Sequence, residues 1–188
     1  QGDFQVKGTR VGIGIFDLCS RQSGNSISVK RKKELTGRSW PNGCHVAEVE
    51  IDAETGEVRL DRYVSVDDVG NTVNPMIVHG QVQGGIASGL GQAVLERTEY
   101  DASGQLLSGS YMDYALPRAD DMPSLSGSLF EKAPCLTNPL GAKGTGEIGA
   151  VAGPPAIVHA VIDALAEKGI TQVDMPLQPQ KIWECLNR

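Results

Sequence analysis

The sequence predicts an α+β fold, in which hairpins and a mixed sheet pack against separate helices. Three observations predict this class. Residues 44–51 and 58–67 alternate apolar and polar side chains with the period of a strand. Residues 76–96 and 154–169 have the apolar spacing of helices. The strands occur as hairpins rather than in βαβ units, which argues against a doubly wound sheet.

Composition limits the classes of protein to which the chain can belong. Its 188 residues include 17 Lys plus Arg and 23 Asp plus Glu, a formal net charge of −6. A non-specific nucleic-acid or membrane-surface binder needs a basic field, so we expect no nucleic-acid partner. No apolar run has the roughly 18–20 residues of a membrane span. The sequence therefore indicates a globular protein, and we expect a cytoplasmic location.

The first 40 residues differ in character from the rest. We predict that residues 1–40 are the remnant of a preceding segment and an irregular linker, with a short helix over 11–21. The linker contains the basic run Lys30–Lys33. Such a run is usually a solvated loop. Contact with nucleic acid or a targeting signal is the alternative, which the acidic balance and the lack of interleaved aromatic residues disfavour.

We expect residues 41–188 to form the main domain, which begins with a hairpin. Its strands cover 44–51 and 58–67, and Ala53–Gly56 forms the turn between them. The apolar residues predicted to share one face of the second strand are Val58, Leu60, Val64 and Val66.

Residues 76–96 have the length and apolar spacing of a helix, yet they include five glycines. In a helix interior each glycine costs up to about 1 kcal/mol relative to alanine. A helix that keeps them packs its backbone tightly against another element or allows a ligand to approach. The pattern leaves both explanations open.

The elements after residue 100 follow from the same patterns. They are a hairpin over 100–111, a strand over 125–135, a helix from Pro154 to Gly169 and a helix over 178–186. Between the strand and the first helix, Pro139 and four glycines prevent regular structure over 137–149.

This irregular loop holds the strongest candidate for chemistry, Glu147. Its glycines would let backbone N–H groups approach an anion. Glu147 lies between Gly146 and Ile148, and a carboxylate that apolar neighbours partly shield can act as a general base. A solvated loop glutamate is the more common outcome of such spacing. The loop is not a phosphate-binding P-loop, because Lys143 precedes glycine rather than serine or threonine.

No group of residues has the spacing of metal ligands. The histidines do not pair, and the cysteines form no CxxC or Cys/His motif. Asp67 and Asp68 lie in a turn, where adjacent aspartates more often cap the loop than bind a metal. We therefore predict no metal-binding side chains and reduced thiols, as in intracellular proteins. The cysteines are Cys19, Cys44, Cys135 and Cys185.

Three segments contain motifs whose joint occurrence is specific. DDVGNTVNP ends the hairpin, GQVQGG begins the glycine-rich helix, and GAKGTGEIG forms the irregular loop. Over roughly residues 40–170 the sequence resembles the molybdopterin-binding large subunit of the molybdenum hydroxylases. This family includes xanthine dehydrogenase, aldehyde oxidase and aerobic carbon monoxide dehydrogenase, and the resemblance is strongest to the last branch.

The resemblance implies roles for individual residues. Glu147 matches the active-site base of the family, which takes a proton from a molybdenum-bound hydroxyl before that oxygen attacks an electron-poor carbon. Gln81 matches a residue that contacts the pterin. The other cofactor-binding candidates are Gly84, Gly85, Gly144, Thr145 and Gly146.

The resemblance also implies what surrounds this chain. The cofactor would be molybdenum–molybdopterin, in its cytosine dinucleotide form, and electrons would pass to 2Fe–2S clusters and FAD on partner subunits. The chain would be the C-terminal part of a longer large subunit, so we expect no cofactor and no activity in isolation. The substrate would be an aldehyde, an N-heterocycle or carbon monoxide. The alternative is a non-catalytic scaffold or binding domain that kept the fold.

Overall fold

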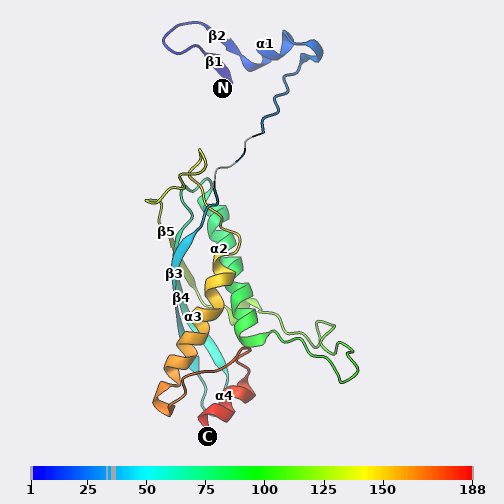
Figure 1. Ribbon diagram of the computed structural model, residues 1–188, viewed down its shortest axis with the longest axis vertical. Helices are drawn as coiled ribbons and strands as arrows, with labels where there is room; N and C mark the ends of the chain where they lie inside the picture. Colours follow the sequence, from blue (N-terminus) through cyan, green and yellow to red (C-terminus); the bar gives the residue numbers. More distant parts are fainter. Residues whose placement is uncertain (1, 33, 35–36, 188) are drawn as a thin grey trace. The chain divides into compact units, whose positions relative to one another are not determined.

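The computed structural model describes residues 2–32, 34 and 37–187 (Figure 1). The chain divides into two units, Gln1–Leu35 and Thr36–Arg188. In the first unit, the elements in chain order are β1 (Asp3–Gln5), β2 (Gly12–Gly14), α1 (Ile15–Ser20) and η1 (Ser23–Asn25). The helix predicted over 11–21 is therefore shorter, because residues 12–14 pair with β1 as an antiparallel strand.

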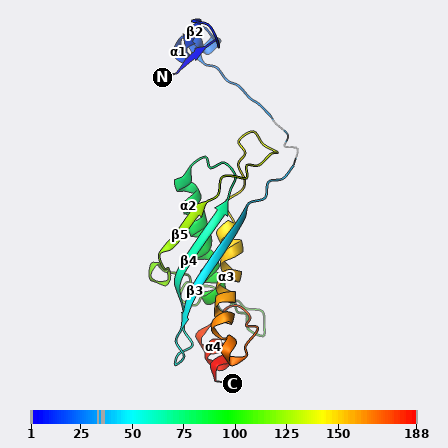
Figure 2. The same ribbon diagram turned by 90° about the vertical axis from the view of Figure 1, so that its left-hand side faces the viewer.

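The second unit has one sheet with helices on one of its faces (Figure 2). Its elements are β3 (Asn42–Ile51), β4 (Val58–Asp68), α2 (Pro75–Leu90), η2 (Gly91–Leu95), η3 (Ala119–Asp121), β5 (Leu125–Leu129), α3 (Ile148–Ala164), η4 (Ala166–Lys168) and α4 (Pro179–Leu186). The strand order is β3-β4-β5, with β4 antiparallel to β3 and parallel to β5. The predicted α+β class is confirmed.

A β-bulge divides β4 into two halves that present different faces. The register against β3 shifts once, so that Asp61 has no partner residue. Because side chains alternate along a strand, one extra residue moves all later side chains to the other face. Leu60 points toward the helices, whereas Val64 and Val66 are 39% and 43% exposed on the opposite face. The prediction that the apolar residues of this strand share one face was wrong, and Tyr63 takes the buried position.

Helices α2 and α3 pack with their backbones in contact. A Cβ atom added to Gly85 would lie 2.8 Å from the Ala150 nitrogen, and one added to Gly149 would lie 2.3 Å from the Val82 carbonyl oxygen. One turn further along, Gly89 lies against Gly153 in the same way. Close packing against another element therefore explains these glycines of the predicted helix.

Several predicted boundaries differ from the structure. Residues 100–111 turn at Asp101–Gly104, but only Tyr100 and Leu106 pair. The strand predicted over 125–135 ends at Leu129, and α3 begins at Ile148 rather than at Pro154. The internal prolines cannot donate helical hydrogen bonds. Contacts of the α3 glycines with α2 support the first turns instead, and the Pro154 ring lies against Gly89.

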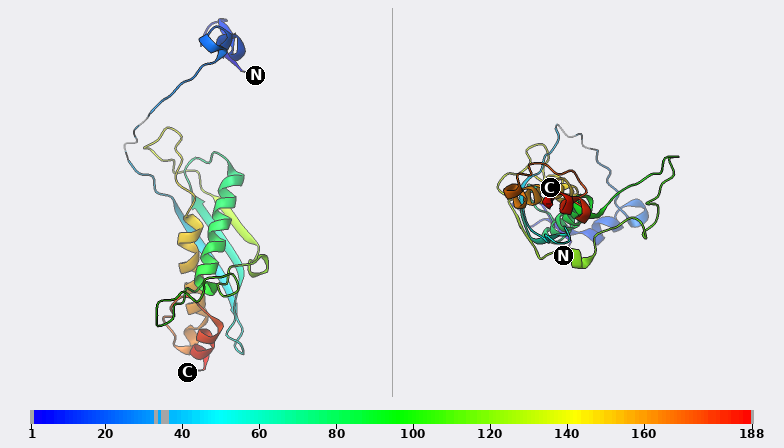
Figure 3. Two further views of the ribbon diagram at one scale, coloured as in Figure 1. Left: turned by 90° about the vertical axis from the view of Figure 1, so that its right-hand side faces the viewer. Right: turned by 90° about the horizontal axis from the view of Figure 1, so that it is seen from below.

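The core lies between the sheet and the helices, and α4 closes one end of it (Figures 1 and 3). Helix α4 occupies its predicted position and packs on the β3–β4 turn, where a Cβ added to Gly56 would lie 2.1 Å from the Pro179 carbonyl oxygen. The largest fully buried hydrophobic residues are Tyr63, Ile86, Ile157, Leu165, Leu177, Ile182 and Val161. In the described ranges, every helix falls short of the length and apolarity that a membrane crossing requires.

Candidate functional site

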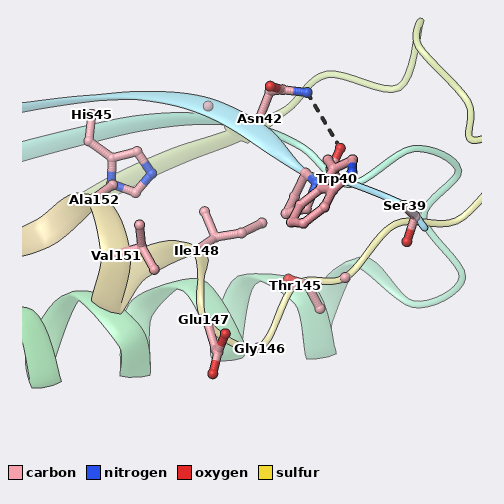
Figure 4. A pocket seen from close by; sticks show the side chains of 13 residues that line it. Ser39, Trp40, Asn42, His45, Thr145, Gly146, Glu147, Ile148, Val151 and Ala152 are labelled. Atoms are coloured by element: carbon pink, nitrogen blue, oxygen red, sulfur yellow. Dashed lines mark hydrogen bonds between the residues drawn. The ribbon is translucent and has the colours of Figure 1, made fainter.

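A groove of about 570 Å³ lies between the start of β3 and the loop that precedes α3 (Figure 4). One wall consists of residues 39–43 together with His45, and the other consists of residues 144–148. Val151 and Ala152 of α3 complete the lining. The two walls come from opposite halves of the domain, so the groove exists only in the folded chain.

The second wall carries Glu147, which occupies the N-cap position of the 17-residue helix α3. Its side chain is exposed, and its carbonyl oxygen accepts a hydrogen bond from the Val151 N–H at 2.9 Å. The carboxylate points away from Trp40, whereas Ile148 points toward it (Figure 4). A helix N-terminus stabilises a nearby negative charge, so this position favours a carboxylate.

Gln81 and Gly84 lie on exposed positions of α2, and the structure brings Gln81 to the loop. A Cβ atom added to Gly146 would lie 3.9 Å from Gln81 Oε1. An added Cβ at Gly84 or Gly144 would meet no described atom within 4 Å. Gly85 differs from these residues, because it is buried against α3 rather than open to a ligand.

Thr145 has a buried hydroxyl that makes no hydrogen bond in the part of the chain that the structure describes. An unsatisfied buried polar group costs about 1–3 kcal/mol. A bound group that offers a donor or an acceptor beside Thr145 would remove that cost. This residue therefore fits a ligand site at the groove.

The loop that leads to Glu147 is fastened to the end of β4. The Lys143 N–H donates to the Val69 carbonyl oxygen at 2.7 Å, and the Asn71 N–H donates to the Gly141 carbonyl oxygen at 3.0 Å. Lys143 Nζ also pairs with Asp68 Oδ2 at 2.5 Å, and each of these two side chains is 11% exposed. The motifs DDVGN and GAKGTGE, separate in sequence, therefore form one structural unit.

Asp68 has two partners. Its Oδ1 accepts a hydrogen bond from the Gly70 N–H at 2.9 Å, which is the loop-capping role predicted for this residue. Burial by itself raises the pKa of the Asp68 carboxyl, but the hydrogen bonds from Lys143 and Gly70 outweigh it and hold the pKa below its usual range.

A buried polar network beside the first wall was not predicted. His45 Nε2 lies 2.9 Å from Asp67 Oδ1, and His45 Nδ1 lies 2.8 Å from Tyr63 Oη. The Ser65 hydroxyl donates to Asp67 Oδ2 at 2.9 Å. Burial, and then the charge of Asp67, raise the pKa of Tyr63, which keeps its phenol proton. The network depends on the bulge in β4, which turns these β4 residues inward, and the apolar pattern of the sequence continues across the bulge without marking it.

Trp40 was also missed. Its indole is 67% exposed and lines the groove opposite the loop (Figure 4). The residue lies within a stretch predicted to be irregular linker, where no periodic pattern marks it as part of a site.

Comparison with known proteins identifies the family. The model of the family described as "Molybdopterin cofactor-binding domain" matches residues 12–123. The chain belongs to this family. The resemblance inferred from the three motifs is therefore confirmed.

Two relatives of this molybdopterin cofactor-binding domain are named as a complex subunit and as a large chain. The 6-hydroxypseudooxynicotine dehydrogenase complex subunit gamma of Paenarthrobacter nicotinovorans is 32% identical, over 97% of this chain and 24% of its own length. The carbon monoxide dehydrogenase large chain of Hydrogenophaga pseudoflava is 37% identical, over 79% of this chain and 18% of its own length. The chain thus spans about a fifth to a quarter of these relatives.

A solved structure supports the same assignment. Quinoline 2-oxidoreductase from Pseudomonas putida 86 superposes with a TM-score of 0.76 at 40% identity, covering 79% of this chain and 19% of the other. The similarity therefore includes the fold as well as the sequence over this part of the chain.

Proposed function

We propose that this chain is the part of a molybdenum hydroxylase large subunit that supplies the active-site base and part of the cofactor pocket. The observation that carries the proposal is that Glu147, in the loop before α3, and Gln81, on the neighbouring helix α2, lie near each other in a molybdopterin-binding fold. When bound, the molybdopterin centre supplies oxidation of the substrate with oxygen derived from water.

The residues present fit such a group. The groove volume of about 570 Å³ lies within the roughly 300–1,000 Å³ of small-molecule sites. The Gln81 side chain offers both a donor and an acceptor to the polar edge of a pterin. Gln81 and Gly84 lie on α2 outside the lining of the groove, whereas Gly144 and Thr145 line it. Gly84 and Gly144 leave open space, and the Thr145 hydroxyl would gain the partner that it lacks.

In this proposal Glu147 accepts a proton at its carboxylate as oxygen is transferred to the substrate. A positioned base of this kind contributes about 10²–10⁴-fold in rate. The N-terminus of α3 stabilises the carboxylate charge that this role requires. Ile148, Val151 and Trp40 supply the apolar part of the groove.

We further propose the cytosine dinucleotide form of the cofactor and partner subunits that carry 2Fe–2S clusters and FAD. The relatives named as a complex subunit and a large chain support a multi-subunit assembly. The substrate class is an aldehyde, an N-heterocycle or carbon monoxide. Because the chain spans only about a fifth to a quarter of these relatives and would supply only part of the pocket, we expect the isolated chain to retain no molybdenum.

The proposal is tested in the complete enzyme by the variant Glu147→Gln. We expect equal molybdenum content and turnover lowered about 10²–10⁴-fold, because the amide keeps the shape but cannot accept the proton. The matched control is Glu54→Gln, which alters an exposed glutamate in the β3–β4 turn. Undiminished turnover per molybdenum in Glu147→Gln would contradict the proposal. Wild-type enzyme without molybdenum, from a host that makes the cofactor, would favour the scaffold alternative.

A further inference from the structure

Two adjacent aspartates at the end of β4 contact the two walls of the groove. Asp67 holds His45, which belongs to the β3 wall, and Asp68 holds Lys143, which precedes the Glu147 wall. Neither aspartate lines the groove itself. The side chains of Asp67 and Asp68 point to opposite faces of the sheet, because successive side chains of a strand alternate.

On the β3 side, the contact between His45 and Asp67 is almost completely buried. The His45 and Asp67 side chains are 2% and 1% exposed. Asp67 Oδ1 also lies close to Gly43, where an added Cβ would approach it to 2.7 Å. Asp67 therefore contacts the start of β3 twice, at the His45 side chain and at the Gly43 backbone. The segment that carries Trp40 leads directly into this part of β3.

On the side of the groove that carries Glu147, the Lys143–Asp68 ion pair is the last side-chain contact to β4 before Glu147 in the described part of the chain. Lys143 lies four residues before Glu147, and its N–H donates to the Val69 carbonyl oxygen. In the described part of the chain, the next backbone hydrogen bond along the loop is the one from the Val151 N–H to the Glu147 carbonyl oxygen. Residues 144–146 thus form a short span between two anchors. Displacing the first anchor shifts the start of this span, which ends at Glu147, the residue that carries the carboxylate.

We infer that Asp67 and Asp68 are positioning residues that set the separation of the groove walls, and that the Lys143–Asp68 pair fixes the place of Glu147. This inference rests on the proposed role of Glu147 as the base. It assigns to the DDVG motif a function that is distinct from loop capping, since capping requires only the bond from Gly70.

The test compares Lys143→Met with wild type in the complete enzyme. Methionine is unbranched and one atom shorter than lysine, so it keeps most of the apolar side chain and removes the charge. We expect kcat per molybdenum to fall about 10- to 100-fold, as for a reacting group displaced by about 1 Å, with KM changed much less. Lys143→Arg should recover part of the loss because it keeps a cation. Arg62→Met, which removes an exposed ion pair with Glu48 on the outer face of the sheet, should leave turnover unchanged.

Amide hydrogen exchange provides a readout that does not depend on activity. Lys143→Met should speed exchange about tenfold or more at the amides of Lys143 and Asn71, which donate to the Val69 and Gly141 carbonyl oxygens, and leave the start of β3, residues 42–45, unchanged. Asp67→Asn should do the reverse. Equal loosening of both walls in both variants would reduce the aspartates to general stabilisers and overturn the inference.

The variant Asp68→Glu covers the case in which Lys143→Met does not fold. It keeps the ion pair but moves the carboxylate by one methylene, so we expect folded, molybdenum-loaded enzyme with lowered kcat. Wild-type kcat in Asp68→Glu and in Lys143→Met would overturn the inference while an inactive Glu147→Gln enzyme upheld the proposed function. Full activity of Glu147→Gln would instead overturn the proposed function itself.

Discussion

Glycine serves opposite purposes in two adjoining regions, the α2–α3 interface and the loop before α3. At the interface, Gly85 and Gly149 are so close to the opposite backbone that an added Cβ would lie within 2.8 and 2.3 Å of it. In the loop, an added Cβ at Gly144 meets no described atom within 4 Å. A glycine-rich sequence therefore does not distinguish packing from ligand approach, because only the spatial neighbours do.

The largest effect on stability should come from the crowded region. Gly149→Ala places a methyl group against the Val82 carbonyl oxygen and the Ile86 nitrogen, and neither backbone atom can move without separating the helices. We expect the free energy of unfolding to fall by about 3 kcal/mol, the upper range for overpacking. Denaturant titration measures it.

The control for this substitution is Gly80→Ala in α2, the helix that Gly149 of α3 contacts. Gly80 is exposed and has open space at the Cβ position. Alanine is the better helix former there, so we expect a gain of up to about 1 kcal/mol. Equal losses in Gly149→Ala and Gly80→Ala would show that helix-wide effects, rather than the contact with α2, determine the cost.

The loop differs from the interface because an ion pair holds it, so its contribution should depend on pH. The pKa of Asp68 is lowered in the folded chain, since the bonds from Lys143 and Gly70 outweigh the effect of burial. A carboxyl with a lower pKa in the folded state stabilises the fold fully above its unfolded pKa of about 4. That contribution is lost as the pH falls through the lower, folded value.

We therefore expect the free energy of unfolding of wild type to fall more steeply below about pH 4 than that of Asp68→Asn, which cannot titrate. Denaturant titrations at a series of pH values measure both slopes. Asp52 is also lowered in pKa, by a hydrogen bond from the Glu54 N–H, but it is exposed and serves as the comparison. If the free energy of unfolding changed with pH equally in wild type and Asp68→Asn, the Lys143–Asp68 ion pair would not contribute to the stability of the loop.

Local patterns predicted much of the fold. Alternation located the hairpin and placed Ala47, Val49 and Ile51 on its buried side, and Gly169 stops the helical region with a φ of +74°, as expected of a C-cap glycine. The bulge at Asp61 has no comparable signal, because the apolar period continues across it. A mixed sheet was predicted, but the sequence did not identify β5 as the strand that pairs in parallel, since strand order depends on contacts distant in sequence.

In the candidate site, too, local features could be predicted from the sequence and contacts between distant residues could not. Glu147 stands out from its own glycine-rich loop, so local spacing marked it as a candidate, and the family resemblance gave it the predicted role of base. Lys143 and Asp68 are 75 positions apart, and no local pattern joins them. The same holds for His45 and Asp67, whose contact depends on the bulge that alternation does not reveal.

The smallest stability effect, and the sharpest test of the comparison, is expected from Gly144→Ala. No described atom lies within 4 Å of the added methyl group, and the residue is exposed, so the free energy of unfolding should change by no more than about 0.5 kcal/mol. If the open space belongs to the cofactor, molybdenum content of the complete enzyme should nevertheless fall. Normal stability with normal molybdenum content would mean that the space faces solvent, and glycine at this position would then serve only the path of the loop.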